Sequence, residues 1–128
     1  MAIDLQVRVP NRPGTLLQVA DALGRGGVNI EGACGYEVGE EGLLHVLVVD
    51  AERGRRTLLN AGVEIEAERQ VVVVDVQNRP GGGAALLRLV ADAGVNIDLL
   101  YTTLDGRLVL GSDEHARLRT ALAAAGKA

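Results

Sequence analysis

The chain has 128 residues, a length that suits one ordinary domain or two small ones. Its composition is 48% hydrophobic, with no Trp, no Phe and two Tyr, so we expect an aliphatic core and a surface without aromatic platforms for stacking bases. The formal net charge of −4 argues against a nucleic acid or an acidic membrane as partner, because those affinities come largely from Lys and Arg.

An internal repeat organises the sequence. Asn-Arg-Pro-Gly at residues 11–14 returns at 78–81, and Gly-Val-Asn-Ile at 27–30 returns at 94–97. Both pairs are offset by 67 residues (78 − 11 and 94 − 27), and chance is a poor explanation for two tetrapeptides that repeat at one offset. The chain is therefore a tandem duplication.

The first copy begins with a strand, because apolar and polar residues alternate over residues 3–9. The Pro and Gly of the repeated tetrapeptide end this strand. A helix follows, ended by two glycines, and its amphipathic stripe consists of Leu16, Val19, Ala20 and Leu23.

The rest of the first copy predicts a hairpin, a helix and a strand. The hairpin runs from about residue 29 to residue 49 around a turn at 39–42. Asp50 is the expected N-cap of a short helix that carries Leu58 and Leu59. Residues 63–68 alternate again and predict the last strand.

The second copy follows the same plan as far as its last helix. It has an expected strand at 70–76 and a shorter hairpin formed by 97–104 and 107–110. Apolar stripes mark its two helices: Leu86, Leu89, Val90 and Ala93 in the first, and Leu118, Ala121, Leu122 and Ala125 in the second, which Ser112 or Asp113 caps. A strand matching 63–68 is missing, which leaves 70–76 as an edge strand.

The order βαββαβ predicts an antiparallel sheet with two helices on one face, a ferredoxin-like α+β fold. We expect two tandem units, residues 1–68 and residues 69–128, the second without its last strand. Each has only about 60 residues, near the lower limit for a core that stands alone. The units should therefore pack on each other or on a second chain.

With this repeat, the chain resembles the ACT domain family over nearly its whole length. Strand, Asn-Arg-Pro-Gly, helix, Gly-Val-Asn-Ile, hairpin and helix are the family's order of parts, and the chain looks most like small proteins made of two ACT units without a catalytic domain. The resemblance implies amino-acid binding, usually between two ACT units. It also implies that the loop asparagine and the asparagine at the second strand contact the ligand, which here are Asn11 and Asn29, and Asn78 and Asn96.

The residues themselves suit such a ligand. The turn after the first strand is expected beside the start of the strand that bears Asn29, and glycine in the turn lets a ligand approach the backbone. Free N–H groups at the following helix N-terminus favour a carboxylate, and asparagine amides both donate and accept. The candidate ligand-binding residues are Asn11, Arg12, Pro13, Gly14, Thr15, Leu16, Asn29, Ile30, Asn78, Gly81, Asn96 and Ile97.

The second copy departs from the first at its loop. Gly83 stands where the first copy has Leu16, inside a run of three glycines. Because glycine costs helix stability, we expect a looser first turn and a site that is roomier or degenerate. In both copies the tetrapeptide could also be a turn without a ligand. Asn29 and Asn96 could serve only to fix the backbone at the start of a strand.

Other chemistry-bearing residues favour structural roles. Cys34 shares strand parity with Ile30, Tyr36 and Val38, so we expect a buried thiol that faces the core. His45 and His115 have no metal-ligand spacing around them, and the ladder Glu64, Glu66 and Glu68 is the wet face of a strand.

Two surfaces are expected to differ in polarity. One face of the first copy's sheet should be polar and exposed to solvent, with Asp4, Gln6, Arg8, Glu64 and Glu66 on it. The second copy has apolar residues at both parities, such as Val71 and Val73 opposite Val72 and Val74. We expect that second surface to be buried against the first copy or in a homodimer.

These features favour a non-catalytic sensor that binds an amino acid at contacts between ACT units. The alternative is an interaction or assembly module that has kept the fold and lost the ligand. An RNA-binding protein ranks below both, because two Tyr are too few aromatic residues to stack bases and the net charge is negative. An enzyme ranks last, because no nucleophile–base pair, metal set or phosphate loop can be assembled from the sequence. We expect no cofactor, a homodimer, and, with one cysteine and no signal-like or membrane-length segment, a cytoplasmic location.

Overall fold

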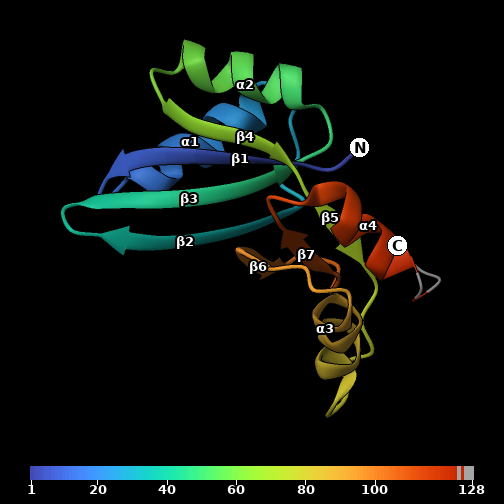
Figure 1. The fold of residues 1–128 in the computed structure, drawn as a ribbon. Helices are drawn as coiled ribbons and strands as arrows, with labels where there is room; N and C mark the ends of the chain where they lie inside the picture. The colour runs from blue at the N-terminus through green and yellow to red at the C-terminus, as the bar shows by residue number, and fades with distance from the viewer. Residues whose placement is uncertain (124, 126–128) are drawn as a thin grey trace. The chain divides into compact units, whose positions relative to one another are not determined.

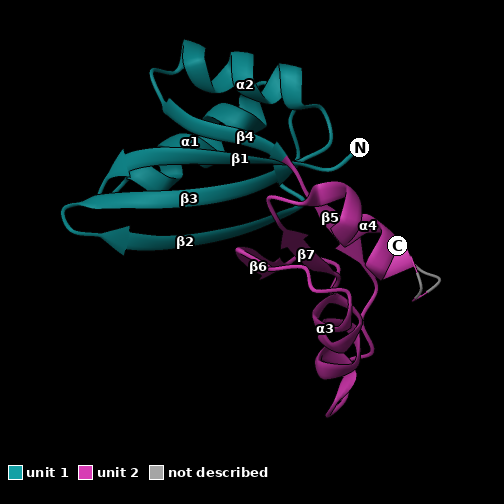
Figure 2. Ribbon diagram, in the orientation of Figure 1, with its two compact units in different colours: residues 1–69 teal, residues 70–128 magenta. Residues whose placement is uncertain are grey.

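The structure, a computed structural model, describes residues 1–123 and 125. The chain forms two compact units, Met1–Arg69 (unit 1) and Gln70–Ala128 (unit 2), which Figure 2 colours separately. Both units have the ferredoxin-like α+β fold, with antiparallel strands and two helices each. The fold class predicted from the repeat is confirmed.

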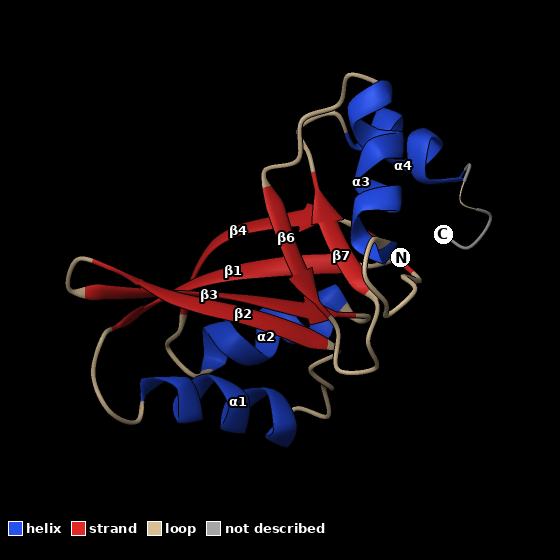
Figure 3. Cartoon of the chain, turned by 90° about the horizontal axis from the view of Figure 1, so that it is seen from below, coloured by secondary structure: helices blue, strands red, loops and turns tan. Residues whose placement is uncertain are grey.

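Unit 1 has the complete order βαββαβ (Figure 1). Its elements are β1 (Ile3–Pro10), α1 (Thr15–Arg25), β2 (Gly32–Val38), β3 (Glu41–Val48), α2 (Ala51–Asn60) and β4 (Glu64–Gln70). The strands lie in the order β2-β3-β1-β4, with β3 antiparallel to both β1 and β2. Figure 3 shows α1 and α2 on the same face of this sheet.

The core of unit 1 lies between the sheet and these helices. Alternate residues of β1 and β3 point toward the helices and meet apolar residues of α1 and α2: Leu5, Val7, Val46, Val48, Val19, Leu23 and Leu58 are all fully buried. Helix α2 packs closely on the sheet, since a Cβ on Gly54 would lie 3.2 Å from Cδ1 of Leu5. Asp50 caps α2 as predicted, its Oδ1 accepting the N–H of Arg53 at 3.1 Å.

The predicted helical stripes need correction at their edges. Leu16 and Ala20 of α1 are exposed, whereas the inward line runs through Thr15, Val19 and Leu23. The hydroxyl of Thr15 donates to the carbonyl of Arg12 at 3.1 Å, which holds this first residue of the helix against the unit and sets the buried line at a spacing of four.

The face of the unit 1 sheet opposite the helices is less polar than predicted. Asp4, expected to face water, is fully buried, and His45, Leu43 and Leu47 on the same face are buried as well. Of the other polar residues predicted for this face, Glu64 and Glu66 are exposed as expected, whereas Gln6 and Arg8 are half-buried.

Cys34 was predicted to face the core, and this is wrong. It pairs in register with His45 on the face opposite the helices and is half-buried, while Tyr36 and Val38 on the same side are exposed. The error has a simple source. Strand parity was counted from Ile30, but β2 begins only at Gly32, so alternation does not extend back to Ile30.

Unit 2 is a smaller version of the same plan. Its elements are β5 (Val72–Val74), α3 (Gly82–Asp92), β6 (Leu99–Thr102), β7 (Leu108–Gly111) and α4 (His115–Ala123). The sheet order is β5-β7-β6, and both pairings are antiparallel. Within the described residues no strand follows α4, so β5 is the outer strand; it is shorter than the predicted 70–76.

The two sides of the unit 2 sheet are both apolar, as the sequence indicates. Val72, Val74 and Leu110 face the helices in the core, while Val73 and Val109 lie on the opposite side. Val71, Tyr101 and Val109 are buried in the single chain. Leu104, at the hairpin turn, is 82% exposed.

Candidate functional site

The loop after β1 is a tight turn that leads directly into α1. The carbonyl of Pro10 accepts the N–H of Arg12 at 3.0 Å, and the carbonyl of Arg12 accepts the N–H of Thr15 at 3.4 Å. Gly14, the N-cap of α1, has a φ of 91°, in the left-handed region that favours glycine. None of the described side chains caps α1. The N–H of Thr15 is bonded to Arg12 and that of Gln18 to Gly14, so the N–H groups of Leu16 and Leu17 are the ones available to an anionic group.

The turn between β2 and β3 lies beside this loop and supplies carboxylates. The N–H of Asn11 donates to the carbonyl of Glu40 at 3.1 Å, and the Asn11 side-chain amide donates to Oε2 of Glu37 at 2.6 Å. Both side chains are exposed. A backbone donor set and a fixed amide–carboxylate pair therefore lie at the same end of unit 1.

The other predicted residues of this loop differ in exposure. Arg12, Pro13, Gly14 and Leu16 are exposed, whereas Thr15 is buried. Within the described residues the guanidinium of Arg12 has neither a hydrogen bond nor an ion pair. Of this exposed group, the Arg12 guanidinium and the loop backbone offer polar contacts to a ligand.

Asn29 and Ile30 do not lie beside this loop, contrary to the prediction. The register pairs Gly32 with Leu47, near the beginning of β1, while the loop follows Pro10 at its far end. Because β1 has eight residues, the two places are about 23 Å apart at roughly 3.3 Å per residue. The prediction missed that the crossover from β1 through α1 makes β2 run in the same direction as β1.

At that opposite end a second amide–carboxylate pair occurs. The side-chain amide of Asn29 donates to Oε2 of Glu31 at 2.7 Å, and both groups are exposed. Ile30, between them, is half-buried. Each end of unit 1 thus carries one asparagine bonded to one glutamate.

The loop of unit 2 repeats the backbone geometry of the first loop. The N–H of Arg79 donates to the carbonyl of Gln77 at 2.9 Å, and the N–H of Gly82 donates to the carbonyl of Arg79 at 2.9 Å. Gly81, the N-cap of α3, has a φ of 86°, and none of the described side chains caps the helix. The run of glycines therefore does not delay the start of α3, which begins at the position equivalent to Thr15.

The asparagines of unit 2 occupy the same places as those of unit 1. Asn78 lies in the loop, and Asn96 with Ile97 lies before β6 at the opposite end of the sheet. The position equivalent to Glu37 is Leu104 (37 + 67), so Asn78 lacks the carboxylate that bonds Asn11. The first loop is the more complete of the two.

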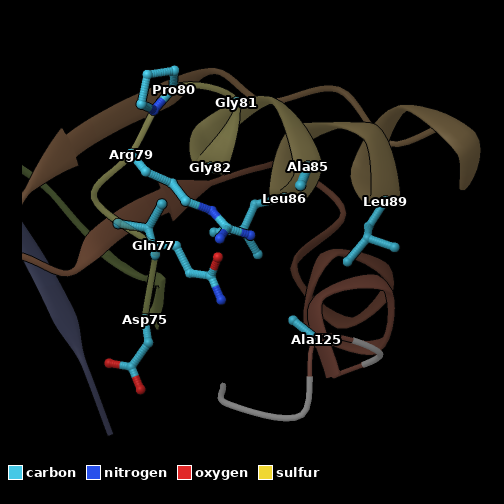
Figure 4. A pocket seen from close by; sticks show the side chains of 11 residues that line it. Asp75, Gln77, Arg79, Pro80, Gly81, Gly82, Ala85, Leu86, Leu89 and Ala125 are labelled. Atoms are coloured by element: carbon cyan, nitrogen blue, oxygen red, sulfur yellow. The ribbon is translucent and has the colours of Figure 1, made fainter.

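A pocket of about 720 Å³ opens beside the second loop. It lies between the end of β5, the loop and one side of α3, and Figure 4 shows Arg79 and Gln77 reaching toward Leu86, with Ala125 across the opening. We call it the β5 groove. Its lining residues are Asp75, Val76, Gln77, Arg79, Pro80, Gly81, Gly82, Ala85, Leu86, Leu89 and Ala125.

Comparison with known families identifies the family of this two-unit chain. The family model described as the ACT domain pair (ACT_8) matches residues 1–124. The chain belongs to this family. The resemblance inferred from the repeated tetrapeptides is confirmed.

Solved structures agree with this ACT fold. Protein BT0572 from Bacteroides thetaiotaomicron is 21% identical with a TM-score of 0.86, over 98% of this chain and 88% of that chain. The ligand-free regulatory subunit of aspartate kinase from Thermus thermophilus is 20% identical with a TM-score of 0.74, over 98% and 90%. At such identities the likeness shows the fold. None of the curated proteins matches the chain.

The β5 groove was not predicted from the sequence. Gly81 is the one predicted ligand residue that lines it, and neither Asn78 nor Asn96 does. The signal that could have found the groove is the expected edge position of residues 70–76, since no strand of the described residues lies on the outer side of β5.

Among residues 1–123 and 125, no group of three or more His, Cys, Asp or Glu is placed to hold a metal ion.

None of the helices formed by those residues is both long enough and apolar enough to cross a membrane.

Proposed function

We propose that this ACT domain pair is a non-catalytic, cytoplasmic regulatory protein that binds an amino acid where two ACT units meet. The observation that carries the proposal is the first loop: an uncapped helix N-terminus, at Gly14, next to an asparagine bonded to a glutamate, Asn11 and Glu37. A free amino acid is a zwitterion, and this loop offers a partner to each of its charges.

The chemistry of the two partners is complementary. The N–H groups in the first turn of α1 and the helix dipole favour the α-carboxylate. The Glu37 carboxylate, exposed and held by Asn11 at 2.6 Å, favours the α-ammonium group through a charge-assisted hydrogen bond. The second pair, Asn29 and Glu31, offers the same combination at the other end of the unit.

The separation of these two ends supports a site shared between units. One unit cannot bring Asn11 and Asn29 to the same small ligand, because β1 spans the distance between them. A second unit, in the same chain or in a second copy, can place its asparagine beside the loop of the first. Ligand binding would then favour one arrangement of the units, which is how a regulatory domain transmits its signal.

A regulatory role is also the role of a structural neighbour, the regulatory subunit of aspartate kinase from Thermus thermophilus. We infer the same kind of role here, with a homodimer as the assembly. A second candidate function, an assembly module without a ligand, is favoured by the β5 groove, which leaves an apolar edge uncovered.

A thermal-shift screen of the full chain against the twenty amino acids tests the proposal. At about 100 times its Kd, a ligand stabilises the native state by about 2.7 kcal/mol, which raises the Tm by several degrees. We expect one clear hit that Asn11→Ala or Asn29→Ala abolishes. Asn60→Ala, an exposed asparagine at the end of α2, is the matched control. A flat screen with folded protein would overturn amino-acid binding and leave the assembly module.

A further inference from the structure

The β5 groove lies where unit 1 has a fourth strand. In unit 1, β4 covers the outer side of β1. Its Ile65 and the preceding residue Val63 pack against the core, and Val63 is only 5% exposed. In unit 2, the described residues place no strand on the outer side of β5. Val76 and Leu89, the core residues of unit 2 that line the groove, are only partly buried because no such strand covers them.

The two units can be compared residue by residue around this place. Ala85 is equivalent to Gln18 (18 + 67), and Ala125 is equivalent to Ala61, since each donates its N–H to the leucine carbonyl three residues earlier. In unit 1 the Gln18 amide closes the gap by donating to the carbonyl of Ala61 at 3.3 Å. In unit 2 both positions are alanine and both line the groove.

The charge beside the groove is reversed between the units. Arg8 of β1 donates to Glu66 of β4 at 2.5 Å, tying the fourth strand to the sheet. The residue equivalent to Arg8 is Asp75 (8 + 67), exposed and with neither a hydrogen bond nor an ion pair among the described residues. Figure 4 shows it pointing away from Ala85 and Leu89. A strand at this place therefore needs a basic residue where β4 has Glu66.

This requirement argues against the fourth strand of a second copy as the occupant. The face of β4 that would lie near Asp75 carries Glu64, Glu66 and Glu68, and like charges opposite each other on neighbouring strands are unfavourable. The occupant must combine the apolar alternation of β4 with the opposite charge.

We propose that the β5 groove binds an extended segment of a partner protein, which adds a strand beside β5. The segment has aliphatic residues at alternate positions, facing Val76, Leu86 and Leu89, and a Lys or Arg on its other side, facing Asp75. Such strand addition gains affinity from main-chain hydrogen bonds and specificity from alternate side chains. It also covers an edge that is otherwise open to unwanted pairing. The inference goes beyond amino-acid binding and does not depend on it.

Two labelled peptides based on β4 test the proposal in a fluorescence anisotropy titration of the full chain. The first is residues 62–70 with Glu66 replaced by Lys, and the second is the same segment unchanged. We expect the lysine peptide to bind about fivefold more tightly at low salt, the upper end for a cross-strand charge pair. In the Asp75→Lys variant the order of the two peptides should reverse.

Two neighbouring alanines provide a variant that fills the groove and a matched control. Ala85 lines the groove and Ala84 does not, yet both are exposed on α3. Ala85→Trp should abolish peptide binding, and Ala84→Trp should leave it unchanged, with circular dichroism showing that both are folded.

Three results would overturn the proposal. The first is no binding of either peptide to the folded chain at 1 mM, which excludes a Kd of about 1 mM or tighter. The second is peptide binding that is indifferent to Asp75→Lys. The third is self-association of the chain that Ala85→Trp removes and Ala84→Trp retains, because a second copy would then occupy the groove.

Discussion

Oδ2 of Asp4 lies 2.8 Å from Nδ1 of His45, and both side chains are buried on the face of the unit 1 sheet that carries no helix. The equivalent positions in unit 2 are Val71 (4 + 67) and Val109 (45 + 64, since its hairpin is three residues shorter). Both valines are buried as well. The two copies have thus kept burial at this place and exchanged a polar pair for an apolar one.

This exchange predicts how the pair responds to mutation. Asp4→Ala leaves His45 buried without its carboxylate and should lower the free energy of unfolding by about 3 kcal/mol. The double variant Asp4→Val with His45→Val copies unit 2 and should be close to wild type, because an apolar pair of suitable volume often replaces a buried polar pair without loss. Urea denaturation measures both, with Asp21→Ala, whose carboxylate is exposed, as control. A double variant as unstable as Asp4→Ala would contradict the expectation.

Two adjacent glycines of α3 should respond in opposite ways to alanine. A Cβ on Gly82 would lie 1.9 Å from the carbonyl oxygen of Gln77, a backbone atom that cannot move aside without disturbing the loop. A Cβ on Gly83 would meet nothing within 4 Å. Gly82→Ala should therefore destabilise the protein by more than 1 kcal/mol, and Gly83→Ala should stabilise it by about 0.5–1 kcal/mol, the usual gain inside a helix. Thermal unfolding of the two variants checks the sign of each effect.

The anchoring of β4 should depend on pH. The hydrogen bonds from Arg8 and then Gln6 hold the pKa of Glu66 below its ordinary value of 4.5. A carboxylate with a lowered pKa in the folded state stabilises the protein above its unfolded pKa, and this contribution is lost as the pH falls through the folded pKa. Glu66→Gln should therefore be less stable than wild type at pH 7, with a difference that declines as the pH falls below 4.5 and is lost as it passes through the lowered pKa of Glu66.

The size of this difference should be small and salt-sensitive, because the pair is exposed to solvent. Urea midpoints at pH 7, 5 and 3 measure it, and Glu64→Gln on the same face of β4 is the control. A difference that persists unchanged at pH 3 would mean that packing, not the charge of Glu66, holds the strand.

The fold was predictable because its signals are local and repeated. Alternation over residues 3–9, the turn tetrapeptides and the helical stripes each identify an element, and the 67-residue offset shows that they occur twice. The errors have two causes: an element boundary placed too early, and a sheet face whose covering the local pattern does not report. The burial of Cys34 was misjudged because β2 begins at Gly32, and that of Asp4 because alternation gives the face of a residue but not what covers it.

The site was predictable only in its local part. The turn at Gly14 and Gly81, with its left-handed backbone, follows from the tetrapeptide itself. The distance from Asn11 to Asn29 depends on the direction of β2 after the crossover, which local pattern does not report. The β5 groove depends on Val76, Leu89 and Ala125 coming together from separate elements, and only the tertiary structure brings them there.

Glu37 should decide whether the first loop selects amino acids over other carboxylates. It is exposed and accepts the amide of Asn11 at 2.6 Å, a hydrogen bond that the glutamine side-chain oxygen can also accept. Glu37→Gln therefore removes the negative charge and retains the geometry. We expect it to weaken the amino acid found in the thermal-shift screen about tenfold, a loss that is typical of a charge-assisted hydrogen bond. The analogue of that amino acid without its α-amino group should bind the variant and the wild type equally, because it has no ammonium group to contact Glu37. Isothermal titration calorimetry measures the Kd of both compounds for the wild type and the variant, and Glu52→Gln, which changes an exposed glutamate of α2, is the matched control. Equally weakened binding of both compounds would show that Glu37 acts on the shape of the loop and not on the ammonium group.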